Sequence, residues 1–144
     1  MLVSRKTRYA LRATFELARR FGTGPVKIAR IAKAQAIPPR FLETILNHLK
    51  RGGLVASRRG KQGGYLLVQP PETITVGAVV RCMQGPVRTV DCGRDDPAET
   101  CPLFDECVFV PLWERVRKAI VDIYDHTTFQ DLVDRDRRAP DYSI

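Results

Sequence analysis

Apolar positions recur at helical spacing in three stretches of the first fifty-one residues. The first follows Ser4, a possible N-cap, and a glycine- and proline-containing turn at 22–25 ends it. The second is short, and the third opens at Pro38-Pro39 and ends before Gly52-Gly53. The inner faces are expected to hold Ala10, Leu11, Thr14, Phe15, Ala18 and Phe21, then Ile28, Ile31 and Ala32, then Phe41, Leu42, Ile45, Leu46 and Leu49. This order predicts a helix-turn-helix.

Two short aliphatic runs, 54–57 and 65–68, follow the third helix and predict a pair of strands. Residues 58–64 between them contain three cations and three glycines. They lack the pattern of a nucleotide-binding loop, and we expect the glycines to allow a close approach to DNA phosphates. The sequence predicts a mainly helical fold with a β-hairpin wing, in which the second helix of the motif enters the major groove.

The second half of the chain is expected to be helical around an irregular segment. Thr75 is the predicted cap of a helix that ends at Gly85, and a long helix starts near Pro111. Thr128 and Asp131 predict a capping box for a last short turn, and the tail from Asp134 is charged enough to be disordered. The expected parts are a winged domain (1–70), a connecting helix (71–86), a cysteine segment (87–109), a dimerisation helix with a short turn (110–133) and a tail (134–144).

The long helix carries an apolar stripe, with Trp113 beside it. We expect the winged domain to cover part of this stripe and a second copy of the chain to cover the rest, which predicts a homodimer. Two copies place their recognition helices in successive major grooves, so the expected operator is pseudo-palindromic double-stranded DNA. The stripe consists of Leu112, Val116, Ala119, Ile120 and Ile123.

Charge is divided unevenly along the chain, and this favours nucleic acid as the partner. Residues 1–69 have a net charge of +13, with Glu16 and Glu43 as their only acids, whereas residues 70–144 have −5. Such a polycation binds phosphate backbones through counterion release. The sequence shows no membrane span and no signal peptide, so a cytoplasmic location is expected. A solvated basic surface is the alternative interpretation of charge alone.

Cys92, Cys101 and Cys107 fall within sixteen residues, separated by eight and then five residues. Cytoplasmic thiols stay reduced, so this grouping indicates metal or redox chemistry rather than disulfides. A structural zinc site usually contains close cysteine pairs, and none occurs here. Iron-sulfur clusters are held by thiolates, and a loop wrapped round a cluster allows irregular spacing. Three incidental thiols remain the alternative.

Several motifs together resemble the Rrf2 family of winged-helix transcriptional regulators, which includes IscR, NsrR and RirA, and the likeness extends to about Val133. The resemblance implies a dimeric repressor or activator whose three cysteines hold an iron-sulfur cluster of two-iron or four-iron type that reports iron, redox state or nitric oxide. The matching stretches are Arg8-Tyr9-Ala10, Gly24-Pro25-Val26, Phe41-Leu42-Glu43, Gly52-Gly53-Leu54-Val55, Arg59-Gly60, Gly63-Gly64-Tyr65-Leu66-Leu67, the cysteine segment and Leu112-Trp113.

Residue roles follow from the same resemblance. Cys92, Cys101 and Cys107 are the implied cluster ligands, Arg59 is the wing residue that enters the minor groove, and Glu43 is a base-contacting acid. Arg58 and Lys61 add charge to the wing, and Arg40 and Asn47 are further expected DNA contacts by their position on the recognition helix.

The fourth ligand departs from the family pattern. IscR-like members have a histidine three residues after the third cysteine, where this chain has Val110, and NsrR-like members use an aspartate where the nearest equivalent is Arg8. Cys92 and Cys101 are also more widely spaced than in the best-known members. Cys82, a carboxylate such as Asp105 or Glu106, and a group from the partner chain remain candidates, although Cys82 is expected to be a small buried apolar residue.

Two other classes of protein are alternatives to a cluster-binding regulator. One is a regulator without a cluster, controlled by thiol oxidation, zinc or a protein partner. The other is an enzyme, which the sequence does not favour because it contains no nucleophile-base pairing signal and no phosphate loop.

Overall fold

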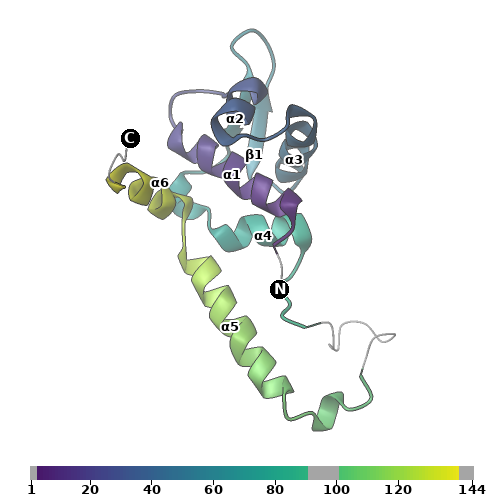
Figure 1. The fold of residues 1–144 in the computed structure, drawn as a ribbon. Coiled ribbons are helices and arrows are strands. Elements are labelled where there is room, and N and C mark those ends of the chain that lie inside the picture. Colours follow the sequence, from purple (N-terminus) through teal and green to yellow (C-terminus); the bar gives the residue numbers. More distant parts are fainter. Residues whose placement is uncertain (1–2, 91–100, 140–144) are drawn as a thin grey trace.

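The computed structural model describes residues 3–90 and 101–139. Its first part is a helix-turn-helix made of α1 (Arg5–Arg19), α2 (Ile28–Gln35) and α3 (Pro39–Arg51), which pack against one another (Figure 1). The Ser4 side chain caps α1 by accepting a hydrogen bond from the Thr7 amide at 3.1 Å, as predicted. Proline at the start of α3 costs no helical hydrogen bond, because the first amides of a helix have no partner within it.

The wing, residues 54–68, is an antiparallel hairpin of β1 (Val55–Arg58) and β2 (Gly64–Leu67). Both strands lie one residue closer to the tip than the sequence predicted, with Val55 opposite Leu67 and Arg58 opposite Gly64. Val26 forms an isolated bridge to Tyr65 through two hydrogen bonds of 2.8 Å, and this bridge ties the wing to the segment before α2.

The hydrophobic core continues beyond the wing into the second half of the chain. The 3₁₀ turn η1 (Pro71–Thr73) leads to α4 (Val76–Gln84), which Thr75 caps as predicted, and α6 (Phe129–Arg138) packs against α1. Phe129 is fully buried and Val133 nearly so, and both belong to the same cluster as the core residues of α1 and α3. The winged-helix core is therefore completed by a helix at the far end of the chain.

One expectation for the C-terminal part is wrong, and another holds only in small part. The capping box of Thr128 and Asp131 is present, but the helix that it starts continues to Arg138, so residues 134–138 are helical rather than disordered. Helix α5 (Val110–His126) projects away from the winged domain (Figure 1), and none of its residues is buried by the described parts of the chain. Leu112, Val116 and Ile123 are exposed and Ile120 is half-buried, so the described residues leave most of the apolar stripe of α5 uncovered.

Candidate nucleic-acid interface and cysteine segment

Helix α3 presents a polar face to solvent that contains every residue expected there to contact DNA. Arg40, Glu43 and Asn47 are exposed at intervals of three and four residues, which places them on one side of the helix. None of the three side chains forms a hydrogen bond or ion pair with any described residue, although the Arg40 guanidinium lies 4.7 Å from the centre of the Phe41 ring. The opposite face is buried in the core through Leu42, Ile45, Leu46 and Leu49.

The wing holds its cations at and beside the tip. Arg58, Arg59 and Lys61 are all exposed, and none has an ion-pair partner within the described ranges. The Lys50 ammonium donates a 2.6 Å hydrogen bond to the Ser57 hydroxyl, which links α3 directly to β1. This contact joins the basic wing to α3 beside it.

Two wing glycines have a structural reason that the sequence analysis missed. A Cβ at Gly63 would lie 2.3 Å from the Arg58 carbonyl oxygen, and one at Gly64 would lie 2.5 Å from the Val26 carbonyl oxygen. Backbone atoms cannot move aside as a side-chain tip can, so a larger residue would break the hairpin or its bridge to Val26. The packing of the wing itself therefore requires glycine at these two positions.

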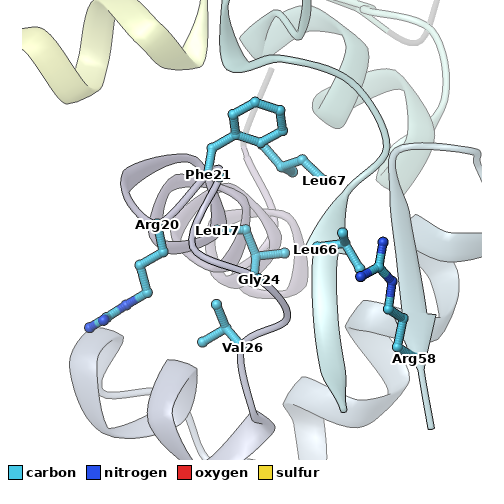
Figure 2. A pocket seen from close by; sticks show the side chains of 9 residues that line it. Leu17, Arg20, Phe21, Gly24, Val26, Arg58, Leu66 and Leu67 are labelled. Atoms are coloured by element: carbon cyan, nitrogen blue, oxygen red, sulfur yellow. The ribbon is translucent and has the colours of Figure 1, made fainter. Parts of the chain in front are cut away.

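A crevice of about 320 Å³ lies between the end of α1 and the wing (Figure 2). Figure 2 shows Phe21 beside Leu67 at one wall, whereas Arg20 points away from the strands. Phe21 was expected on the inner face of the first helix, but it follows the end of α1 and is 45% exposed. The lining contains no acid, histidine or cysteine, so this crevice offers no group for acid-base or nucleophilic chemistry.

The described part of the cysteine segment contains Cys101 and Cys107 on either side of the 3₁₀ turn η2 (Phe104–Glu106). The Phe104 amide donates to the Cys101 carbonyl at 2.9 Å, and the Cys107 amide donates to Phe104 at 3.4 Å. Both thiols are half-buried, and the Cys107 carbonyl accepts a hydrogen bond from Val110 at the start of α5. One short turn therefore connects the two thiols to the long helix.

Cys92, the third expected ligand, lies outside the described residues. Within those residues, no group of three or more histidine, cysteine, aspartate or glutamate side chains is placed to hold a metal ion. Cys101 and Cys107 are donors of the right kind for an iron-sulfur cluster, because thiolates are its usual ligands. They would supply two of the donors that such a cluster needs, and Asp105 and Glu106 lie on the turn between them.

Cys82 faces a different part of the molecule. Its Sγ atom lies 3.9 Å from the His48 carbonyl oxygen, and a Cβ at Gly52 would come within 2.4 Å of it. Burial raises the pKa of this thiol, which keeps it protonated. Cys82 is half-buried and packs against the hydrophobic core beside the end of α3, which agrees with the expected filler role.

The helix-turn-helix, the basic wing and the exposed polar face of α3 together define a winged-helix DNA-binding protein. The family model for Rrf2, described as an iron-dependent transcriptional regulator, matches residues 3–135. The chain belongs to the Rrf2 family, and it is a transcriptional regulator. None of the helices in the described ranges has the length and apolar character needed to cross a membrane.

Relatives of two kinds support this assignment. The chain is 36% identical over 133 residues to the HTH-type transcriptional regulator CymR of Bacillus subtilis, covering 92% of this chain and 89% of CymR. The solved structure of that protein, described as the global cysteine regulator of B. subtilis, superposes with a TM-score of 0.78 at 34% identity, covering 94% of this chain and 98% of CymR. These relatives are transcriptional regulators rather than enzymes.

The other kind is IscR. The HTH-type transcriptional regulator IscR of Pectobacterium atrosepticum is 35% identical over 133 residues, with 92% of this chain and 79% of IscR covered. The structure of T. potens IscR superposes with a TM-score of 0.77 at 34% identity, covering 94% of this chain and 88% of that chain. By similarity alone, the chain is almost equally close to CymR and to IscR.

Proposed function

We propose that the protein is a homodimeric regulator that binds a pseudo-palindromic operator through α3 and the wing. Arg40, Glu43 and Asn47 contact base edges and backbone, Arg59 enters the minor groove, and Arg58 and Lys61 contact phosphates. The observation that supports this most directly is the arrangement on α3, where three polar side chains are exposed without a described partner beside a basic wing. Side chains already engaged in ion pairs would have to break them before they contacted DNA.

The wing gives a direct test. Arg59→Ala is expected to weaken operator binding by about 1–3 kcal/mol, because a cation that enters the groove is lost. The matched control is Arg137→Ala, which removes an exposed arginine from α6 on a different part of the domain. Binding is measured by fluorescence anisotropy at several salt concentrations, with a duplex selected by the wild-type protein. Equal affinity of the Arg59 and Arg137 variants would exclude the wing from the interface.

The sensor is proposed to be the cysteine segment, in which Cys92, Cys101 and Cys107 hold an iron-sulfur cluster. Such a cluster, when bound, supplies redox-active iron that is lost under oxidants or iron scarcity. The half-buried thiols of Cys101 and Cys107, joined by one turn to the start of α5, support this assignment. Three thiolates with one weaker ligand hold a cluster loosely, which suits a sensor.

The path from the thiols to DNA uses contacts that the structure describes. Helix α5 begins beside Cys107 and ends against α4, where Arg81 Nη2 lies 2.6 Å from Asp125 Oδ1. The Val76 amide donates to Thr127, and the Phe129 amide donates to Ile74, both at 2.9 Å. Thiol ligation that orders the start of α5 therefore shifts the population of arrangements in which the two winged domains fit the operator spacing.

The experiment is anaerobic purification followed by visible absorption, iron and sulfide analysis. Single Cys→Ala changes at 92, 101 and 107 are each expected to abolish the absorption, whereas Cys82→Ala is expected to keep it. Retention of the absorption in all three variants would exclude these thiols as ligands.

A regulator without a cluster is the second candidate, controlled by thiol oxidation, zinc or a protein partner. The similarity to CymR, which is described as a cysteine regulator, favours it. Protein from oxygen-free cells that contains neither iron nor sulfide, yet changes its operator affinity when its thiols are oxidised, would favour this candidate over the first.

A further inference from the structure

Glu16 is a charged residue in a place where charges are costly. It is one of two acids in the +13 half of the chain, and its side chain is fully buried between α1 and α2. Among the residues that the structure describes, it is the only charged residue that is buried. A buried carboxylate is tolerated only when hydrogen bonds and opposite charges replace the water that it loses.

Both carboxylate oxygens of Glu16 are occupied. Arg20 Nε donates to Oε1 at 2.6 Å, while Oε2 accepts from Gln35 Nε2 at 2.8 Å and lies 3.4 Å from Arg19 Nη1. Burial raises the pKa of Glu16, but the hydrogen bonds from Gln35 and Arg20 and the charges of Arg19 and Arg20 outweigh it, so the pKa falls below its ordinary value. The carboxylate is therefore ionised and fixed in one position.

Gln35 is the residue that joins this carboxylate to the DNA-reading part of the fold. It is the last residue of α2, and α1 holds it at two points, because Arg12 donates to its backbone carbonyl while Glu16 accepts from its side chain. The next residue, Ala36, adopts a left-handed conformation with φ 49° and ψ 49°, and it begins the turn into α3. The Ile37 amide closes the turn on the Ala32 carbonyl at 3.0 Å.

The backbone conformation of Ala36 explains why the contacts from α1 to Gln35 are needed. It is the only non-glycine residue with positive φ in the described ranges, and an L-residue enters that region at a cost in energy. A strained turn persists when surrounding contacts over-determine it. The two contacts from α1 to Gln35 are immediately before the strained residue, so they restrict the direction in which the chain leaves α2.

We propose that Glu16 is a positioning residue for DNA recognition, which holds Gln35 and thereby sets how α3 is presented to the major groove. Glu16 itself touches no DNA in this arrangement. The inference rests on the proposed use of α3 as the recognition helix. Its consequence is that sequence-specific binding depends on a buried carboxylate on a neighbouring helix.

The test compares operator affinity with affinity for an unrelated duplex. Glu16→Gln keeps the size of the side chain but removes its charge, and Gln35→Ala removes the hydrogen bond from a residue that is only half-buried. Each is expected to weaken binding to a duplex selected by the wild-type protein by about tenfold, about 1.4 kcal/mol. Binding to the unrelated duplex is expected to stay within about twofold, because it depends on phosphate contacts.

A stability control separates positioning from general loosening. Phe129→Leu removes apolar volume from the same core and leaves the Glu16–Gln35 hydrogen bond in place. All variants are measured at a temperature at which circular dichroism shows them fully folded. Phe129→Leu is expected to lower the unfolding midpoint but to keep operator affinity within about twofold of wild type.

A reversed pair provides a rescue. Gln35→Glu places two carboxylates together and is expected to weaken operator binding more than Gln35→Ala. Glu16→Gln combined with Gln35→Glu restores a hydrogen bond with the donor and acceptor exchanged, and is expected to return affinity to within about threefold of wild type.

The outcomes distinguish this inference from the function on which it rests. Wild-type protein with no preference for any sequence would overturn the recognition role of α3 and the positioning role together. Specific binding by wild type, with the Glu16 and Gln35 variants no weaker than Phe129→Leu, would overturn the positioning role alone.

Discussion

Helices α3 and α5 are both amphipathic, but only one of them finds its apolar partner within the described chain. Helix α3 buries Leu42 and Leu46 completely, with α1 and β1 packed against it. Helix α5 leaves Leu112 42% and Val116 39% exposed, and none of its residues is buried. An exposed apolar stripe on a helix of about 25 Å is costly in water. The comparison teaches that folding stability resides in the winged core, whereas the described residues leave the apolar stripe of α5 available for the proposed second copy of the chain.

The largest effect is expected in the core, at a residue that follows α5 in sequence. Phe129→Ala should lower the free energy of unfolding by about 3–5 kcal/mol, because a fully buried aromatic ring leaves a cavity. Urea unfolding measures this, and Arg137→Ala, an exposed site on the same helix, should change stability by less than about 0.5 kcal/mol. Similar small losses for both variants would mean that α6 does not belong to the winged core.

The next largest effect is expected on association rather than folding. Val116→Glu should raise the dissociation constant of the dimer about hundredfold or more, because an unpaired carboxylate enters an apolar contact. Sedimentation velocity over a concentration series measures this, and the thermal unfolding of the winged domain should persist. Lys118→Gln changes the charge by the same amount on another face of α5 and should leave the dimer intact. A Val116→Glu protein that remains fully dimeric would place the interface elsewhere.

The contrast between the two regions also explains which elements the sequence predicted. Helical periodicity, cap residues and turn glycines are local signals, and Ser4, Thr75 and Thr128 all cap helices as expected. The sequence predicted only a short turn in place of α6, because the charged residues from Asp134 onward resemble a disordered tail. Contacts with segments far earlier in the chain, α1 and η1, stabilise it, and one of them is Arg19 Nε at 3.8 Å from Asp136 Oδ2.

The candidate site also contains some residues that the sequence predicted and others that it did not. The exposed positions of Arg40, Glu43 and Asn47 follow from the spacing of the apolar residues around them, so the sequence was sufficient. The role of Gln35 and the left-handed Ala36 depend on how α1 crosses α2, which no local pattern encodes. One signal was available, since Glu16 is one of two acids in a strongly basic half and lies within the apolar stretch of its helix.

The smallest effect has a sign that distinguishes two alanines at the C-terminal end of α2, one inside the helix and one just after it. Ala36→Gly should raise the free energy of unfolding by about 0.5–1 kcal/mol, because removing the Cβ relieves a left-handed strain of about 1–2 kcal/mol, which exceeds the extra chain entropy that glycine loses on folding. Ala34→Gly, two residues earlier and exposed on α2, should lower it by a similar amount, because there glycine only weakens a helix. Urea unfolding with unchanged slopes measures both. Shifts in the same direction would mean that the turn into α3 is unstrained, and the contacts of Glu16 and Arg12 to Gln35 would then have no strain to counter.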